Sequence, residues 1–373
     1  MTSIRMRGIL ALLGAFFVGL FMGSSEQGVL KNLIASGSAI TIVVSDSSGR
    51  SKSKIDNKVN AAGAAITKDV LALSSSSSSN VNVNSDNKEP HLCYENPYYT
   101  SIKPPHTLET AKQKAEEWMA SKSKIMEKVV AESNGETHKK FNGFHVMAPC
   151  DYECTGRCRD DTSKIVCGLA KLREAHDTKC IVYSIGGNNQ WAFEENMYDM
   201  SPCEIHTFDC TGPITRFRVP SRIRDRVHFH HVCMSNENQP APAVAAVQKI
   251  GNPIMGEMWT LEKMQQQLNH TRLDLLKMDI EGFEWPIFDS WPLLLDYEES
   301  SKVKLPMQVL VEVHYRTQMA ALKRNGSTYF RDSEDLVNLA ERLLKIGYVV
   351  AVRDDNNLCA HCSELTLLRH MCY

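Results

Sequence analysis

The sequence lacks the charge pattern of a nucleic-acid-binding protein. Its 42 Lys and Arg residues nearly balance its 44 Asp and Glu residues, and no basic stripe runs along the chain. Binding to a phosphate backbone needs such a patch or stripe, so we expect no nucleic-acid partner. The chain has 373 residues, 43% of them hydrophobic, which suffices for one catalytic-sized domain with a full core and accessory segments.

No apolar run reaches the roughly 20 residues that usually span a bilayer. The closest is the uncharged run from Gly8 to Gly23, which follows Arg5 and Arg7. Two interpretations stay open for residues 1–25. One is a signal peptide cut near Gly23. The other, which we favour, is a short signal-anchor with its basic end in the cytosol. The anchor predicts a single-pass type II membrane protein with a lumenal domain in the Golgi or endoplasmic reticulum, and cleavage predicts a secreted one.

Other features agree with a lumenal or extracellular chain. Twelve cysteines suit a compartment where disulfides persist. Asn269-His270-Thr271 and Asn325-Gly326-Ser327 are acceptor sequons for N-glycosylation. Residues 26–90 are rich in Ser, Asn, Asp and Lys and end in SSSSSSNVNVNSDNKEP. Such a composition buries too little apolar surface to fold, so we expect a disordered stem.

Two groups of residues raise the question of a metal. Cys150, Cys154 and Cys158 recur every four residues, and Cys359 and Cys362 form a Cys-x-x-Cys. Thiolate zinc sites usually show a two-residue gap and a second matching pair, so we favour disulfides for the first group. For the Cys-x-x-Cys we favour a local disulfide or two free thiols over a redox or zinc half-site. The spacing of His228, His230 and His231 suits a metal, but no matching acidic or histidine partner is evident. We therefore assign no metal.

The rest of the chain reads as a helical, cysteine-rich extension (residues 91–165) followed by a larger α/β domain (166–373). One helix is predicted from Thr107, a plausible N-cap, to about Ser133. In the larger domain, DLVNLAERLLKIG predicts an amphipathic helix that stops at a glycine. Seven short apolar runs are separated by helical patterns and polar loops: CIVYSIGG, CEIHTFDCT, VHFHHVCMS, LDLLKMDI, MQVLVEVHY, YVVAVRD and ELTLLRH.

These runs predict a doubly wound, mostly parallel seven-stranded sheet. Near-continuous apolar strands that alternate with helices are typical of parallel sheets covered on both faces. The last two runs are joined by DNNLCAHCS, which is too short for a helical crossover. The terminal strand is therefore expected to pair antiparallel.

In open α/β sheets, ligands bind outside the carboxyl ends of the strands. The first strand runs into Gly186, Gly187 and Asn189, which we take as candidate cofactor-binding residues because glycines allow close backbone approach. The second strand ends before Asp209, whose carboxylate suits a ribose diol. The alternatives are an ordinary turn for the glycines and a helix cap for Asp209.

The fourth and fifth strands end in charged residues. Lys277, Asp279 and Glu281 follow an apolar run, and buried charge needs a partner or a function. We expect Lys277 to pair with Asp279 or a neighbouring carboxylate. His314 shares a strand face with Glu312 and is expected to reach the same crevice. Asp279, Glu281 and His314 are therefore the candidate catalytic residues, and a salt-bridged strand end with a structural histidine is the alternative.

The segments VYSIGGNNQWAFEE, EIHTFDCT and LDLLKMDIEGFEW resemble FkbM-type methyltransferases and related eukaryotic methyltransferase-like domains, from roughly residue 160 to the C-terminus. The resemblance implies a Rossmann-like class I fold that uses S-adenosyl-L-methionine and has an antiparallel last strand. It implies that the Gly186 loop faces the methionine part, that Asp209 binds the ribose, and that Asp279, Glu281 and Gly282 lie beneath the methyl group, with Asp279 contacting the cofactor.

One departure from this pattern concerns the first loop. SIGGNN has no acidic residue before its glycine and no full Gly-x-Gly-x-Gly. The cofactor ammonium therefore lacks its most familiar partner, for which Glu194 or Glu195 is a substitute.

The function that follows is O-methylation of a hydroxyl on a glycan or small molecule in the secretory pathway, with His314 or Asp279 as the base. The alternative is a non-catalytic lumenal binding module, which the departure in the first loop favours. A nicotinamide-dependent oxidoreductase is disfavoured because GGNNQW lacks Gly-x-Gly-x-x-Gly. A structural metal protein built on the cysteine clusters is a third possibility.

Overall fold

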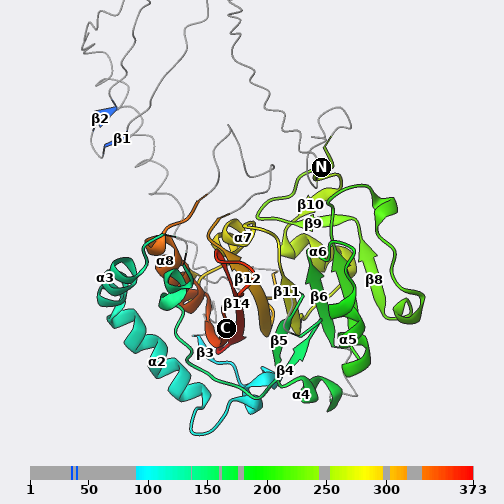
Figure 1. Cartoon of the computed structure of the whole chain (residues 1–373). Coiled ribbons are helices and arrows are strands. Elements are labelled where there is room, and N and C mark those ends of the chain that lie inside the picture. The colour runs from blue at the N-terminus through cyan, green and yellow to red at the C-terminus, as the bar shows by residue number, and fades with distance from the viewer. Residues whose placement is uncertain are drawn as a thin grey trace, which may run out of the picture. The chain divides into compact units, whose positions relative to one another are not determined.

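The computed structural model describes residues 90–135, 137–158, 162–174, 180–242, 253–296, 303–316 and 330–372, and the backbone of 35–36 and 39–40 (Figure 1). The chain divides into two compact units, residues 1–84 and 85–373. In the first, β1 (Ala35–Ser36) pairs antiparallel with β2 (Ala39–Ile40). The expected signal-anchor lies outside the described residues, as does nearly all of the expected stem. Within the described ranges, no helix combines the length and hydropathy needed to cross a bilayer.

The second unit is built around the seven-stranded sheet. Its order is β13–β14–β12–β11–β6–β7–β8, and β14 is antiparallel to both of its neighbours. Figure 1 labels β14, β12, β11, β6 and β8 of this sheet. The other pairs are parallel. The strands are β6 (Ile181–Ile185), β7 (Glu204–Phe208), β8 (Val227–His230), β11 (Leu275–Met278), β12 (Gln308–His314), β13 (Tyr348–Asp354) and β14 (Cys362–Arg369). The predicted fold class is confirmed, and the terminal strand lies between β12 and β13 rather than at an edge.

The central strands are apolar because both faces of the sheet are covered. Every residue of β6 and of β12 is buried. The α-helices described within residues 166–373 are α4 (Leu169–Glu174), α5 (Ala192–Met200), α6 (Leu261–Leu268), α7 (Glu284–Ser290) and α8 (Ser333–Ile346). The predicted glycine stop of α8 is confirmed: Gly347 is left-handed with φ 106°. The N-terminus of α8 has a capping box, in which the side chains of Asp332 and Asp335 each accept a hydrogen bond from the other residue's backbone N–H.

The N-terminal extension contains two helices where one was expected. α2 (Leu108–Ala120) begins at the predicted N-cap Thr107, but Ser121 leaves the helical conformation before α3 (Lys122–Glu132). The remaining short elements are η1 (Pro97–Ser101), η2 (His138–Gly143), η3 (Ile214–Arg216), η4 (Ser221–Ile223), η6 (Leu294–Asp296), β3 (His91–Leu92), β4 (Tyr152–Thr155), β5 (Lys164–Cys167), β9 (Val232–Met234), β10 (Glu257–Trp259) and β15 (Met371–Cys372). Because β3 pairs with β15, the start of this extension lies against the C-terminal end of the chain.

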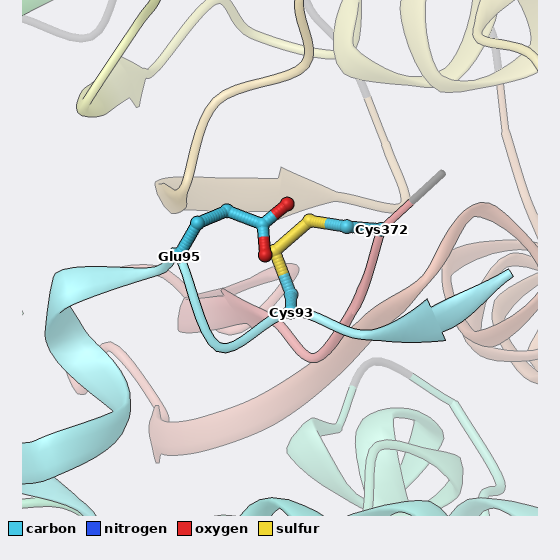
Figure 2. Close-up of side chains that lie close together, drawn as sticks. All are labelled: Cys93, Glu95 and Cys372. Carbon is cyan, nitrogen blue, oxygen red and sulfur yellow. A yellow bond between two sulfur atoms is a disulfide. The ribbon is translucent and has the colours of Figure 1, made fainter.

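All twelve cysteines form disulfides, which confirms the preference for disulfides over a thiolate metal site. The pairs are Cys93–Cys372, Cys150–Cys167, Cys154–Cys158, Cys180–Cys203, Cys210–Cys233 and Cys359–Cys362. Figure 2 shows Cys93–Cys372 with the Glu95 carboxylate beside it. The sulfurs of Cys93 and Cys372 are bonded to each other, so the group of Cys93, Glu95 and Cys372 has no thiolate to offer a metal.

Candidate active site

The first loop packs against the end of β11. Gly186 follows β6 with φ 81°, and a Cβ built there would overlap the carbonyl oxygen of Asp279. Only glycine fits this left-handed, crowded position. The structure thus brings together two residues that the sequence placed at separate strand ends. Gly187 is also confined, because a Cβ there would lie 3.1 Å from the Thr207 methyl group.

Asp209 holds the next part of this loop. It is buried, and its Oδ2 accepts a 2.7 Å hydrogen bond from the backbone N–H of Asn188. Its Oδ1 accepts from the N–H and the hydroxyl of Thr211, at 2.8 and 2.6 Å. The Asn189 side-chain oxygen accepts from the indole N–H of Trp191 and the N–H of Arg218, at 3.1 and 3.0 Å. Both asparagines are left-handed, so these bonds stabilise a loop conformation that few residues adopt.

The structure separates the two glutamates at the start of α5. Glu195 lies 3.8 Å from Arg222 in an ion pair. Glu194 points inward and is 1% exposed; its Oε1 accepts from the Thr207 hydroxyl at 3.2 Å. Its Oε2 is buried and has no hydrogen-bond partner among the described residues. Burial raises the pKa of Glu194, and nearby Lys277 opposes that rise.

Lys277 does not supply the ion pair that we expected for Asp279. Its Nζ donates to the carbonyls of Ile185 and Gly186, at 3.2 Å each. The partner of Asp279 is instead Lys164 of β5, whose Nζ lies 3.4 Å from Asp279 Oδ2. Lys164 is 1% exposed and also pairs with Glu364 of β14. It belongs to a short strand far upstream, so the pattern at the end of β11 gives no indication of it.

The two oppositely charged groups keep each other ionised. Burial acts to raise the pKa of Asp279, but Lys164, Lys277 and His314 outweigh it and lower that pKa below its usual range. Burial acts to lower the pKa of Lys164, yet Asp279, Glu364 and Glu312 raise it. Asp279 is therefore a carboxylate at neutral pH, and its side chain is 22% exposed.

Two neighbouring carboxyl groups titrate near neutral pH. Burial, with the charges of Asp279 and Glu364, raises the pKa of Glu312 to about 8. Burial also raises the pKa of Glu364 to about 7, although Lys164 opposes it. Glu312 is 3% exposed and accepts a 3.0 Å bond from the Asn356 amide. Groups with pKa values near the working pH are suited to general acid–base chemistry. From the sequence, Glu312 shares a strand face with His314 but has no predicted role.

His314 is buried among carboxyl groups at the end of β12, and its raised pKa does not suit a general base. Its Nδ1 lies 3.0 Å from Glu284 Oε1, and its Nε2 lies 3.8 Å from Glu281 Oε2. Burial acts to lower the pKa of His314, but Glu284, Glu312 and Asp279 outweigh it and raise that pKa to about 10. The raised pKa favours the imidazolium, which has no lone pair to accept a proton, so the function proposed below does not use His314 as the base. The His314 ring lies close to three carboxyl groups, those of Glu284, Glu281 and Glu312.

The turn after β11 contains the two remaining charged residues of the segment LDLLKMDIEGFEW, Glu281 and Glu284. Glu284 is fully buried and accepts from the backbone N–H groups of Ile280 and Gly282, at 3.3 and 3.2 Å, as well as from His314. Glu281 is left-handed with φ 57°, and its side chain is 55% exposed. Non-glycine residues in this conformation are strained and are found mostly at functional sites.

Comparison with known proteins shows the family of the chain. A family model described as a methyltransferase domain matches residues 109–367, which is more than half of the chain. The chain belongs to this methyltransferase domain family. The matched region contains every residue of the site described above, including Lys164 and Glu364.

Two curated relatives are also named as methyltransferase-like proteins. The chain is 28% identical over 134 residues to "probable methyltransferase-like protein 24" of Rattus norvegicus, covering 36% of this chain and 32% of the relative. It is 27% identical over 135 residues to the Homo sapiens protein of that name, with 36% and 32% covered. The match thus spans about a third of these relatives' length. The methyltransferase part of the stated resemblance is confirmed, and the FkbM-type label is not.

Solved structures also match part of the chain. The ribosomal protein L11 methylase of Lactobacillus delbrueckii subsp. bulgaricus is 11% identical, with 53% of this chain and 73% of that chain covered and a TM-score of 0.27. A fibrillarin pre-rRNA processing protein of Methanococcus jannaschii is 7% identical, with 52% and 67% covered and a TM-score of 0.31. These values are too low to support an inference about this chain.

Proposed function

We propose that the chain is an S-adenosyl-L-methionine-dependent methyltransferase whose site lies at the carboxyl ends of β6, β7 and β11. The observation that supports this most is the set of acidic side chains on the segments that follow these strands: Glu194, Asp209, Asp279 and Glu281. The cofactor carries a cationic ammonium, a cationic sulfonium and a ribose diol, all of which carboxylates bind well. The buried Oε2 of Glu194, which has no hydrogen-bond partner among the described residues, supplies the acceptor that SIGGNN lacks.

In this proposal the Gly186, Gly187 and Asn189 backbone lies along the methionine part, and Asp209 binds the ribose. A carboxylate offers about four acceptor sites, so Asp209 retains capacity beside its bonds to Asn188 and Thr211. When bound, the cofactor supplies a methyl group already activated by its sulfonium. The chain then has to align the acceptor, exclude water and take up the acceptor's proton.

We propose that Asp279 and Glu312 together take up the proton that the acceptor hydroxyl releases. Asp279 is the more exposed of the two and in this proposal contacts the acceptor, while its charge helps to raise the pKa of the buried Glu312. At pH 7 Glu312 keeps a proton because its pKa is raised to about 8. Above that pH both carboxyls are ionised, and the pair takes up one proton from an acceptor hydroxyl. Turnover is therefore expected to rise as the pH rises through about 8.

For the acceptor we propose a hydroxyl of a glycan or a small molecule in the secretory pathway. Six disulfides suit an oxidising compartment, and a protein anchored in the Golgi or endoplasmic reticulum membrane, or secreted, meets glycans there. No residue of the site selects this acceptor, since one fold hosts many functions.

The test is transfer of a labelled methyl group from the cofactor to a panel of glycans and small hydroxyl compounds, using the full chain. We expect Asp209→Asn to raise the KM for the cofactor and Glu281→Gln to lower kcat. Glu116→Gln, an exposed helix residue, serves as the control and should change neither. In Glu312→Gln the rise of kcat near pH 8 should disappear. A profile that keeps this rise in Glu312→Gln contradicts the assignment of the proton.

A non-catalytic binding module is the second candidate, because several polar groups of the first loop already bond within the protein. Asn188 N–H is held by Asp209, and the Asn189 side chain by Trp191 and Arg218. This alternative predicts that folded protein binds no cofactor.

A further inference from the structure

A second cluster of ionisable side chains lies on β7, β8 and the segment after α6. Glu204 and His206 share one face of β7, and His228 and His230 share the adjacent face of β8, since His206 is in register with His228. His270 joins them from the connection between α6 and β11, with its ring centroid 4.8 Å from that of His206. Glu204 is the first residue of β7, so the cluster lies toward the end of the strand opposite Asp209.

The spacing of three of these side chains matches a metal site. One ligand atom each from Glu204, His206 and His270 lies within 4.8 Å of the others. Glu204 Oε1 is 3.2 Å from His206 Nε2. Neighbouring ligands at bond lengths of about 2.0–2.1 Å around a tetrahedral ion are about 3.3–3.4 Å apart. A further histidine, His228, has its Nε2 3.4 Å from the same Glu204 oxygen.

One atom of the cluster lacks a partner in the protein. His206 is 4% exposed, and its Nε2 is buried with no hydrogen bond among the described residues, although Glu204 lies close by. Buried polar atoms of this kind are uncommon because leaving them unpaired is costly. A cation between His206 Nε2 and the Glu204 carboxylate removes that cost.

The other ring nitrogens are held as they are in metal-binding histidines. His206 Nδ1 lies 3.0 Å from His230 Nε2, and His270 Nδ1 lies 2.8 Å from the Tyr183 hydroxyl. These contacts leave the Nε2 atom of both rings for an ion. Histidines that bind metals usually have their second nitrogen bonded in this way, which orients the ring.

We propose that Glu204, His206 and His270 form a binding site for a divalent transition metal, with zinc as the ion that suits this nitrogen and carboxylate set best. His230 and Tyr183 are positioning residues. The ion joins β7 to the segment that leads into β11 and thereby stabilises this edge of the sheet. The site is separate from the proposed methyltransferase chemistry. The proposal also revises our assignment of no metal. The acidic and histidine partners that were not evident for the histidines of the third strand are Glu204 and His206 on β7, together with His270.

The test is titration of tag-free full-length protein with zinc chloride after chelator treatment and dialysis, with calorimetry for affinity and elemental analysis for stoichiometry. We expect one zinc per chain. Glu204→Gln keeps the shape of a one-third-exposed side chain and should lower the affinity at least about 100-fold, as should His270→Ala. Tyr183→Phe should lower it about 10- to 100-fold, because it removes the hydroxyl that orients His270.

His91→Ala is the matched control, since His91 is half exposed and lies outside the cluster. It should bind zinc like the wild type, and zinc should raise the Tm of both proteins but not that of Glu204→Gln. Binding below one equivalent by the folded wild type overturns the proposal. So does equal binding by the wild type, Glu204→Gln and His270→Ala.

Discussion

Replacing Glu312 by Gln tests the electrostatics of the candidate active site. The amide has the shape of the protonated carboxyl but does not ionise. The pKa of Glu312 is raised from 4.5 to about 8 in the folded chain. The folded state therefore keeps a proton that the unfolded state releases in this range. The resulting stabilisation is complete below about pH 4.5 and is lost as the pH rises through about 8.

The magnitude follows from the same shift. One pKa unit corresponds to about 1.36 kcal/mol, so the full shift amounts to at most about 5 kcal/mol. Between pH 5 and pH 8.5 at most about 3.8 kcal/mol of this change occurs, because part of the titration lies outside that window. Because Asp279 and Glu364 titrate with Glu312, we expect about 2–4 kcal/mol. Relative to the wild type, the free energy of unfolding of Glu312→Gln should rise by this amount between pH 5 and pH 8.5.

The assay is urea unfolding at both pH values with the disulfides intact. Comparing the two differences cancels any cost of the substitution that does not depend on pH. Glu116→Gln, on the exposed side of α2, should show a change of no more than about 0.5 kcal/mol. If the difference between wild type and Glu312→Gln is the same at pH 5 and pH 8.5, the reasoning about this buried carboxyl is refuted.

Three further predictions concern other parts of the molecule. Lys164→Met leaves two partly buried carboxyl groups without their cation and should cost about 3–5 kcal/mol in urea unfolding, whereas the exposed Lys112→Met should stay within about 0.5 kcal/mol. Replacing Cys93 and Cys372 together by Ser removes the link between β3 and β15 and should lower the free energy of unfolding by about 2–5 kcal/mol; an unchanged midpoint would show that the link carries no stability. Glu281→Gly relieves a left-handed backbone and should raise stability by about 1 kcal/mol while lowering methyl transfer; a loss of stability would contradict the strain at this turn.

The fold was predictable because its signals are local. Each central strand is a short apolar run, and the short linker before β14 leaves room only for antiparallel pairing. The break at Ser121 was missed because no glycine or proline marks it. The disulfide pairs were not predicted either, since connectivity depends on which strands and loops become neighbours.

Within the candidate site, the residues at strand ends were predictable and their partners were not. The rule that ligands bind at carboxyl ends selects Gly186, Asp209 and Asp279 from the sequence. Lys164 enters from a strand far upstream, so its pairing with Asp279 depends on the folded chain. The charge of His314 likewise depends on buried carboxylates that converge only in three dimensions.

The most direct test of the account is calorimetric titration of the full-length chain with S-adenosylhomocysteine and S-adenosylmethionine. We expect binding of one equivalent in the micromolar range, weakened at least about tenfold by Asp209→Asn and unchanged by Glu116→Gln. Absence of binding by correctly folded protein would contradict the proposed cofactor site and favour the non-catalytic module.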